Sequence, residues 1–263
     1  MSVNDKSIID ENEVAKLGFD PSRLQRVEER VKEDIAKGKC HGASIIAARH
    51  GKIALDITEG FSNLSEQKKL EPNSVFATMS VAKQFTNVLA LSLVERGLLY
   101  LHAPVCELIP EFATLGKEKV NLYHLLTHTS GIMSAIPPVS PEVLTNIEEL
   151  VKFACQLPLE NQPGERVNYS ILLGHSIIAA LCLKADGRGR SYSQMLHEDL
   201  FRPLGMKDTS LGAREDLMSR LCPVKVSYKD IPALLPPEAV EGLGGILTIP
   251  NGELPGGGCI STV

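Results

Sequence analysis

The first strong pattern in the chain is a helical repeat of apolar positions between Pro21 and Lys37. Charged residues separate the apolar ones, which are Leu24, Val27, Val31 and Ile35. This spacing places the apolar side chains on one face of a helix, as is typical of a surface helix that covers a core. The pattern predicts an amphipathic helix that needs a packing partner.

Two β-like runs follow, at residues 42–50 and 52–58, with Gly51 between them. A glycine between two such runs indicates a tight hairpin, on which the helix is expected to pack. The polar stretch 62–74 predicts a loop. A two-stranded hairpin is marginal by itself, so further strands are expected after the helical part of the chain. No obvious run of that kind is visible there.

A second strong pattern is the apolar run from Val81 to Gly97, which follows the β-like run VFATM and predicts a helix that ends at the glycine. Most of the remaining chain has helical spacing, and helices are expected near 103–109, 119–127, 141–156, 170–184, 192–201 and 213–221. The tail from Val240 onward is rich in glycine. Its glycines at 242–245 and 256–258 lack the strand–turn–helix setting of a phosphate loop and are expected in turns.

Composition places this pattern in a globular α+β chain. The chain has 263 residues, of which 43% are hydrophobic, so it can bury a sizeable core. We expect one domain over residues 1–263, with 20–62 in the sheet region, 75–222 mainly helical, and 223–263 as a glycine-rich C-terminal segment.

Charge and cysteine content limit the binding partners and the cellular compartment that the sequence favours. A net charge of −5, with both signs interspersed, predicts binding to neither nucleic acid nor anionic membranes. The N-terminus has no signal-peptide pattern, and no apolar run approaches the roughly 18 residues of a membrane span. Six scattered cysteines without a C-x-x-C pair favour reduced, mostly buried thiols. These features predict a cytoplasmic protein.

Ser80 and Lys83 give the chain its strongest candidate chemistry. Three positions apart at the start of a helix, they lie on one face, where the amine can accept the proton of the hydroxyl. The helix N-terminus also favours a developing oxyanion and disfavours a protonated amine nearby. The bland alternative is that Ser80 is only a helix N-cap. A second S-x-x-K, Ser65 to Lys68, lies in a polar loop without such a frame and is attributed to chance.

Tyr169 is the best candidate for a third catalytic group. A hydroxyl near the lysine can relay a proton to the leaving group. Tyr169 follows the loop PGERVN and immediately precedes a long apolar helix, so it can be held firmly and still face a cleft. The alternative is an aromatic plug at the start of that helix.

Other candidate sites have weaker support. His124 and His128 are one helical turn apart, as in a zinc pair, but no glutamate follows the first histidine. The sequence has no G-x-S-x-G nucleophile elbow. No cysteine opens a helix beside a basic group, which makes a cysteine nucleophile a minor alternative. Neither a metal nor another cofactor is expected.

Five segments in fixed order resemble one known family. They are SVAK at 80–83, LLTHTSG at 125–131, PGERVNYS at 163–170, PLGMKDTS at 203–210 and PGGGCISTV at 255–263. This order is similar to that of class C-type serine β-lactamases, D-alanyl-D-alanine peptidases, and the family VIII-type esterases and transesterases of the same fold. The likeness covers roughly residues 20–263. It implies that Ser80 is acylated, that Lys83 is its base, and that Tyr169 protonates the leaving group. Gly256, Gly257 and Gly258 are then expected to contact substrate.

Ile171 departs from the family pattern. The resemblance places an asparagine there, whose amide helps to hold the substrate and the lysine, whereas an isoleucine side chain can neither donate nor accept a hydrogen bond. This difference favours esters or thioesters over β-lactams or peptide amides.

A second departure concerns the end of the sequence. In the family, the glycine-rich segment precedes further sheet strands, one of which carries a Lys-Thr-Gly-type motif and the second oxyanion donor. Here the sequence ends at Val263, so we expect those strands to be missing. Loss of one such donor costs about 3 kcal/mol of transition-state stabilisation.

Two hypotheses follow. The first is a serine hydrolase or acyltransferase that acts on small esters or thioesters through an acyl-enzyme at Ser80. The alternative is a catalytically incomplete homologue, or a fragment of a longer enzyme, that binds a ligand or pairs its open sheet edge with another chain, such as a second copy of itself.

Overall fold

The computed structural model describes residues 10–227 and 236–263. Residues 1–9 and 228–235, which belong to the expected N-terminal and glycine-rich segments, lie outside the described residues. The chain divides into two compact units. The hairpin unit comprises Met1–Phe76, Ser219–Gly242 and Thr262–Val263, and the helical unit comprises Ala77–Met218 and Leu243–Ser261. Because compact units can belong to one domain or to two, the single domain stays a prediction.

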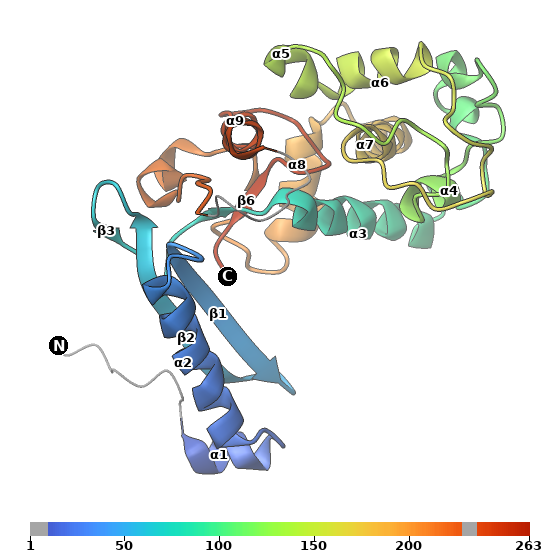
Figure 1. Cartoon of the computed structure of the whole chain (residues 1–263). Coiled ribbons are helices and arrows are strands. Elements are labelled where there is room, and N and C mark those ends of the chain that lie inside the picture. The colour runs from blue at the N-terminus through green and yellow to red at the C-terminus, as the bar shows by residue number, and fades with distance from the viewer. Residues whose placement is uncertain (1–9, 228–235) are drawn as a thin grey trace. The chain divides into compact units, whose positions relative to one another are not determined.

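The hairpin unit begins with two helices, α1 (Glu11–Lys16) and α2 (Pro21–Ala36). The Asp20 carboxylate accepts the Ser22 N–H, and Pro21 occupies the first helical position, so both residues favour a helix start there. Helix α2 lies along the hairpin strand β2 (Figure 1). The structure thus confirms the amphipathic helix and its packing partner.

The hairpin consists of β1 (Gly42–Arg49) and β2 (Lys52–Asn63), paired antiparallel. His50 and Gly51 form the turn with φ values of 51° and 73°, which the right-handed twist of a two-residue hairpin favours. Strand β2 continues beyond residue 58 into the expected loop and pairs with the short β3 (Lys68–Lys69). The loop prediction was therefore wrong at both of these places, because backbone pairing there does not need an apolar pattern.

The hairpin unit has a small core. Its buried apolar residues are Val14, Leu24, Ala54, Leu55 and Ile57. In the sheet order β1–β2–β3, strand β1 lies at an edge. The segment that follows the helical unit returns to this unit, where the Arg220 side chain donates to the Asn73 carbonyl at 2.7 Å.

The helical unit contains most of the expected helices, with different boundaries. Its α-helices are α3 (Ala82–Glu95), α4 (Leu122–Leu126), α5 (Pro141–Leu144), α6 (Ile147–Cys155), α7 (Leu173–Asp186) and α8 (Tyr192–Leu196). Helix α9 (Pro237–Leu247) belongs to the hairpin unit up to Gly242 and to the helical unit from Leu243. Shorter turns of 3-10 helix are Met79–Val81, Val105–Glu107, Pro110–Phe112 and Glu215–Arg220, and His197–Phe201 is a π-helical turn.

Three expected elements differ from those observed. The helix expected over 141–156 is broken into α5 and α6, because Asn146 is non-helical and its side chain caps the second helix by accepting the Glu149 N–H. The helix expected at 213–221 is a single 3-10 segment. The glycines at 242–245 lie inside α9 rather than in turns. Buried Leu247 joins this helix to the core of the helical unit, and such packing overrides the low helix propensity of glycine.

Helix α7 is the centre of the helical unit, where it contacts α3, α4 and α6 (Figure 1). Ile177 and Ile178 on α7 are fully buried, as is Leu93 on α3. A helix that is mostly apolar around its circumference belongs in the interior, which agrees with the largely apolar sequence of this segment.

A second small sheet has the strand order β4 (Phe76–Ala77), β6 (Cys259–Ser261) and β5 (Ser210–Leu211). Strand β6 is a tail strand that the sequence pattern does not reveal, and β4 lies within the expected β-like run. The N–H and hydroxyl of Thr78 both donate to the Cys259 carbonyl at 2.9 Å. These bonds anchor the chain just before Ser80.

Candidate active site

Ser80 lies in the 3-10 turn Met79–Val81, immediately before helix α3. Met79 has a φ of 49°, so the backbone turns sharply between the anchored Thr78 and the helix. Ser80 is exposed to solvent. The N-terminal end of a helix carries a partial positive charge, and Ser80 lies at that end of α3.

Lys83 lies one turn further on and is buried, with 3% of its surface exposed. Its Nζ donates to Ser80 Oγ at 3.2 Å and to the Gly256 carbonyl oxygen at 2.5 Å. The Gly256 carbonyl therefore fixes the amine beside the hydroxyl. This contact joins residues that are 173 positions apart in the sequence.

The surroundings of Lys83 favour its neutral form. Burial lowers its pKa from the ordinary value, and Tyr169 opposes this shift. The ion pairs found among the described residues include none to Lys83. An amine without a carboxylate partner can act as a base near neutral pH.

Tyr169 completes the cluster from the loop that precedes α7. Its hydroxyl donates to Ser80 Oγ at 2.8 Å, and Lys83 Nζ lies 5.1 Å from its ring centroid. The ring is 45% exposed. The structure thus brings together the three side chains that the sequence analysis selected, and Ser80 Oγ is in contact with both of the other two.

The glycine segment 256–258 lies in a buried turn, as expected for these three glycines. A Cβ at Gly256 would lie 3.1 Å from the Ile171 carbonyl oxygen, and one at Gly258 would lie 3.0 Å from the Leu254 carbonyl oxygen. Tight packing against these backbone oxygens therefore disfavours side chains at Gly256 and Gly258. Gly256 serves the site through its carbonyl. Substrate contact by Gly256, Gly257 and Gly258 stays a prediction.

Ile171 is half-buried and packs against the core of the helical unit. Its N–H donates to the Ser134 carbonyl at 3.3 Å, so the backbone, not the side chain, makes the polar contact at this position. The polar clamp on Lys83 comes instead from Gly256.

His128 and His175 are site residues that the sequence analysis missed. The His128 ring lies 4.5 Å from the Tyr169 ring and 5.5 Å from the His175 ring. His175 Nε2 lies 3.0 Å from the Asn87 side-chain oxygen. Burial, followed by the charge of Lys83, lowers the pKa of both histidines, and that of His175 falls to about 3. The position of His128 inside the LLTHTSG segment was the available signal.

His124, the other half of the HLLTH pair, lies on α4 and packs beside the Tyr123 ring. Within the described part of the chain, no group of three His, Cys, Asp or Glu side chains is placed to hold a metal ion.

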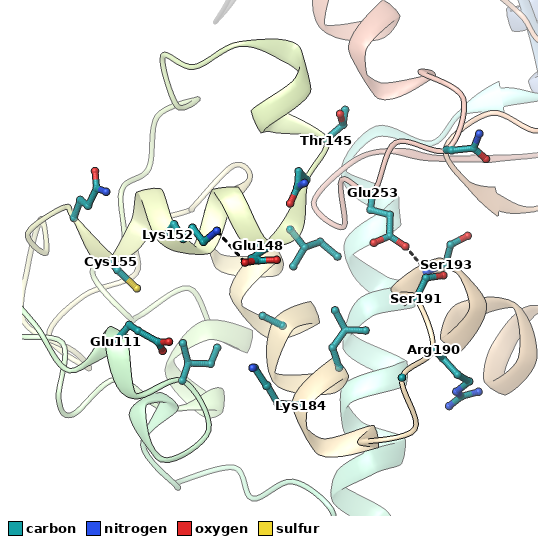
Figure 2. Close-up of a pocket in the computed structure, with 18 residues that line it drawn as sticks. Glu111, Thr145, Glu148, Lys152, Cys155, Lys184, Arg190, Ser191, Ser193 and Glu253 are labelled. Carbon is teal, nitrogen blue, oxygen red and sulfur yellow. Dashed lines mark hydrogen bonds and ion pairs between the residues drawn. The ribbon is translucent and has the colours of Figure 1, made fainter.

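A separate cavity of about 1180 Å³ lies between α6, α7 and the segments around residues 190 and 252 (Figure 2). Lys152 pairs with Glu148 at 2.9 Å, and Glu253 accepts the Ser193 N–H at 2.8 Å. None of the Ser80, Lys83 and Tyr169 side chains lines this cavity. It is distinct from the candidate site.

Residues 27–263 match the family described as Beta-lactamase. The chain therefore belongs to the β-lactamase family of serine hydrolases, and its fold is the α+β β-lactamase/transpeptidase-like fold. This confirms the resemblance drawn from the five motifs.

Three proteins are similar to this chain in sequence or in fold. Protein flp of Staphylococcus aureus (strain MW2) is 27% identical over 193 residues, which are 71% of this chain and 38% of flp. Esterase EstB of Burkholderia gladioli is 28% identical over 191 residues, which are 66% of this chain and 48% of EstB. The structure of EstCE1, described as a hydrolase with promiscuous acyltransferase activity, has a TM-score of 0.75 at 20% identity, covering 92% of this chain and 70% of that one.

The chain spans less than half the length of these two curated relatives. Across residues 10–227 and 236–263, no helix combines the length and apolar character needed to cross a membrane.

Proposed function

We propose that the protein is a serine esterase or acyltransferase that forms an acyl-enzyme at Ser80. The observation that supports this most directly is the pair of contacts at Ser80 Oγ, 3.2 Å from Lys83 Nζ and 2.8 Å from the Tyr169 hydroxyl. The buried Lys83 amine and the Tyr169 phenol thus both contact the hydroxyl oxygen of the exposed Ser80. This arrangement suits acyl transfer by general acid–base catalysis.

In the proposed acylation step, Ser80 Oγ attacks the ester carbonyl carbon and its proton passes to the neutral Lys83 amine. A neutral amine can reverse the hydrogen bond seen here and accept that proton. The tetrahedral intermediate then collapses, the ester C–O bond breaks, and Tyr169 gives its hydroxyl proton to the leaving alkoxide. The Tyr169 phenolate then recovers a proton from the Lys83 ammonium. The step thus yields an acylated Ser80, a free alcohol and a neutral amine.

The backbone N–H of Ser80 is the proposed first oxyanion donor, because it lies in the first helical turn. Deacylation repeats the same proton transfers with water or an alcohol as the attacking group. Water gives hydrolysis and an alcohol gives transesterification. The acyl-enzyme is common to both outcomes.

An ester or thioester is the proposed substrate. The apolar Ile171 offers no side-chain amide to hold a lactam or peptide amide beside Lys83. Esters also need less help in expelling their leaving group, because an alkoxide leaves more readily than an amide nitrogen. The esterase name of EstB and the description of EstCE1 agree with this choice.

The test is a fluorophosphonate probe together with p-nitrophenyl butyrate, applied to the wild-type chain and to Ser80→Ala. We expect labelling at Ser80 and a burst of p-nitrophenol, both lost in the variant. Mass spectrometry should place the adduct on the peptide that contains Ser80. If a folded wild-type sample shows no Ser80-dependent labelling at any probe concentration, the proposal is wrong for this chain.

As a second proposal, two copies of the chain associate through β1. This contact would give the chain an interaction role even if it were a catalytically incomplete homologue. Strand β1 lies at the edge of its sheet, and Ile46 on it is 39% exposed. A second copy could add its own β1 there. Size-exclusion chromatography should show a dimer that Ile46→Lys converts to a monomer, and a monomeric wild-type chain would contradict this proposal.

We also propose a cytoplasmic location. All six cysteines are free thiols, of which three (Cys182, Cys222 and Cys259) are buried and three (Cys40, Cys106 and Cys155) are half-buried, fewer buried thiols than expected. Cell fractionation with an antibody to the chain tests this, and recovery in an oxidising compartment would contradict it.

A further inference from the structure

His128 contacts the chain on both sides of Tyr169. The His128 carbonyl accepts the Asn168 N–H at 2.7 Å, and His128 Nδ1 accepts the Ser170 N–H at 3.3 Å. Its ring lies against the Tyr169 ring, with 4.5 Å between centroids. One residue therefore restrains the tyrosine through the preceding peptide, the following peptide and the aromatic face.

The backbone of His128 has an uncommon conformation. Its φ of 54° lies in the left-handed region, which residues other than glycine rarely adopt. Such conformations persist only where the surrounding structure imposes them, and they concentrate at functional sites. This turn directs the His128 carbonyl and ring toward the same loop.

The residues after His128 continue this contact. Thr129 O accepts the Gly164 N–H at 2.8 Å, and Gly131 O accepts the Glu160 N–H at 2.7 Å. A Cβ at Gly131 would lie only 2.0 Å from the Asn161 carbonyl oxygen, so this position requires glycine. The 128–131 segment thus joins the loop that carries Tyr169 to the body of the helical unit.

We propose that His128 is a positioning residue that holds the Tyr169 phenol against Ser80 Oγ, with its Nδ1 lone pair as the acceptor for the Ser170 N–H. This inference rests on the proposed acyl-transfer function. It assigns the histidine of the LLTHTSG segment to the alignment of the proton relay.

The acceptor role requires a neutral imidazole with its proton on Nε2. Burial, and then the charge of Lys83, lowers the pKa of His128, which keeps the ring neutral at neutral pH. The titratable groups around the ring are Lys83 from α3, His175 from α7 and Tyr169 itself. Protonation of Nδ1 would remove the acceptor, so acid should loosen the loop.

The first test follows the hydrogen bond without using activity. In ¹⁵N-labelled wild-type protein, the Ser170 amide shift should move between pH 8 and pH 4 together with the ¹⁵N shifts of the His128 ring. In His128→Asn, which tolerates the left-handed backbone and offers Oδ1 as acceptor, the Ser170 amide should not follow such a titration. A wild-type Ser170 amide that is insensitive to His128 ionisation overturns the proposal, even if the enzyme is active.

The second test is a double-mutant cycle with p-nitrophenyl butyrate. His128→Ala should lower kcat by about tenfold to a hundredfold with little change in KM, because it impairs a general acid–base group rather than substrate binding. In the Tyr169→Phe background the same change should have an effect of less than about threefold, since the group it positions is gone. His128→Asn should recover most of the lost rate, and His124→Ala, one turn away, is the matched control.

The outcomes separate the two proposals. If wild type shows no Ser80-dependent turnover but the Ser170 amide follows His128, acyl transfer is wrong and the contact stands. If turnover depends on Ser80 and His128→Ala is equally harmful with and without the Tyr169 hydroxyl, the positioning role is wrong.

Discussion

The hairpin unit and the helical unit differ in how they exclude water. Among the described residues, the buried apolar cluster of the hairpin unit has five members and that of the helical unit has 33. The first is formed by two helices and a narrow sheet whose edge strand β1 is unpaired on one side. The second surrounds a helix, α7, that is buried along most of its length. The deeper core can hold side chains in place far more firmly.

All the candidate catalytic groups lie in the helical unit. Ser80, Lys83, Tyr169, His128 and Gly256 each belong to it. Acyl transfer needs groups held within a fraction of an ångström, and rigid elements with packed supports provide this. The candidate site therefore depends on the helical core, and changes in the hairpin unit should affect activity and stability less than matched changes in the helical unit.

The largest expected effect is a loss of activity when the lysine of the Ser80–Lys83 pair is replaced, compared with the same change in the Ser65–Lys68 pair. Lys83→Ala should lower Ser80 acylation by at least about a thousandfold, nearly as much as Ser80→Ala, because the two act as one unit. Lys68→Ala, in the hairpin unit, is the matched control and should leave the rate unchanged. Stopped-flow release of p-nitrophenol measures both. A mild effect of Lys83→Ala would show that Lys83 is not the base.

The next largest expected effect is on stability, and it should differ between the two units when a buried leucine in each core is truncated to alanine. Leu89 and Leu55 are both 1% exposed, the first in the helical core and the second in the hairpin core. We expect Leu89→Ala to cost about 4–5 kcal/mol in unfolding free energy and Leu55→Ala about 2–3 kcal/mol, because a thin core collapses more easily around a cavity. Urea unfolding followed by far-UV circular dichroism measures this, since the chain has no tryptophan. Equal costs would remove the distinction between the cores.

Acid should weaken the helical unit through His175, which is 1% exposed. Burial, and then the charges of Lys83 and His128, lowers its pKa from 6.5 to about 3. Above pH 6.5 neither state binds this proton, whereas between 6.5 and 3 only the unfolded chain does. Stability therefore falls as pH falls, by about 1.4 kcal/mol per pH unit for this group.

His175→Phe tests this term because it keeps a ring of similar size without the titration. From pH 7 to pH 4.5, wild type should lose about 3 kcal/mol more unfolding free energy than the variant. Identical pH dependence in the two proteins would show that His175 does not control acid stability.

The smallest expected effects come from helix caps, one in each unit. Asp20 accepts the Ser22 N–H at 2.9 Å, and Asn146 accepts the Glu149 N–H at 3.1 Å. Each substitution by alanine should cost about 1 kcal/mol. Hydrogen exchange should then increase over 21–36 and 42–63 for Asp20→Ala, and over 147–155 for Asn146→Ala. Exchange that increases in both units after either change would mean that they open together.

The sequence determined what depends on neighbouring residues. The amphipathic period gave α2 its boundaries, and the β-like runs around Gly51 gave the hairpin. Helical geometry alone brought Ser80 and Lys83 to one face, because residues three apart are neighbours on a helix. The ordered motifs around them identified the family. The place of Tyr169 between a loop and a long apolar helix selected it as a candidate, although nothing local shows what it touches.

The tertiary structure decided what depends on distant residues and on burial. Tyr169 reaches Ser80 across 89 positions and Gly256 reaches Lys83 across 173, contacts that no local pattern contains. The tertiary structure also placed glycines inside α9, because packing outweighs their low helix propensity. The helix expected over 141–156 is broken because the Asn146 side chain caps a new helix there. Above all, it buried Lys83 without a carboxylate partner. Desolvation depends on all the surrounding residues. The sequence could therefore name Lys83 as the candidate base, whereas only the fold could lower its pKa and so favour the neutral amine that accepts a proton.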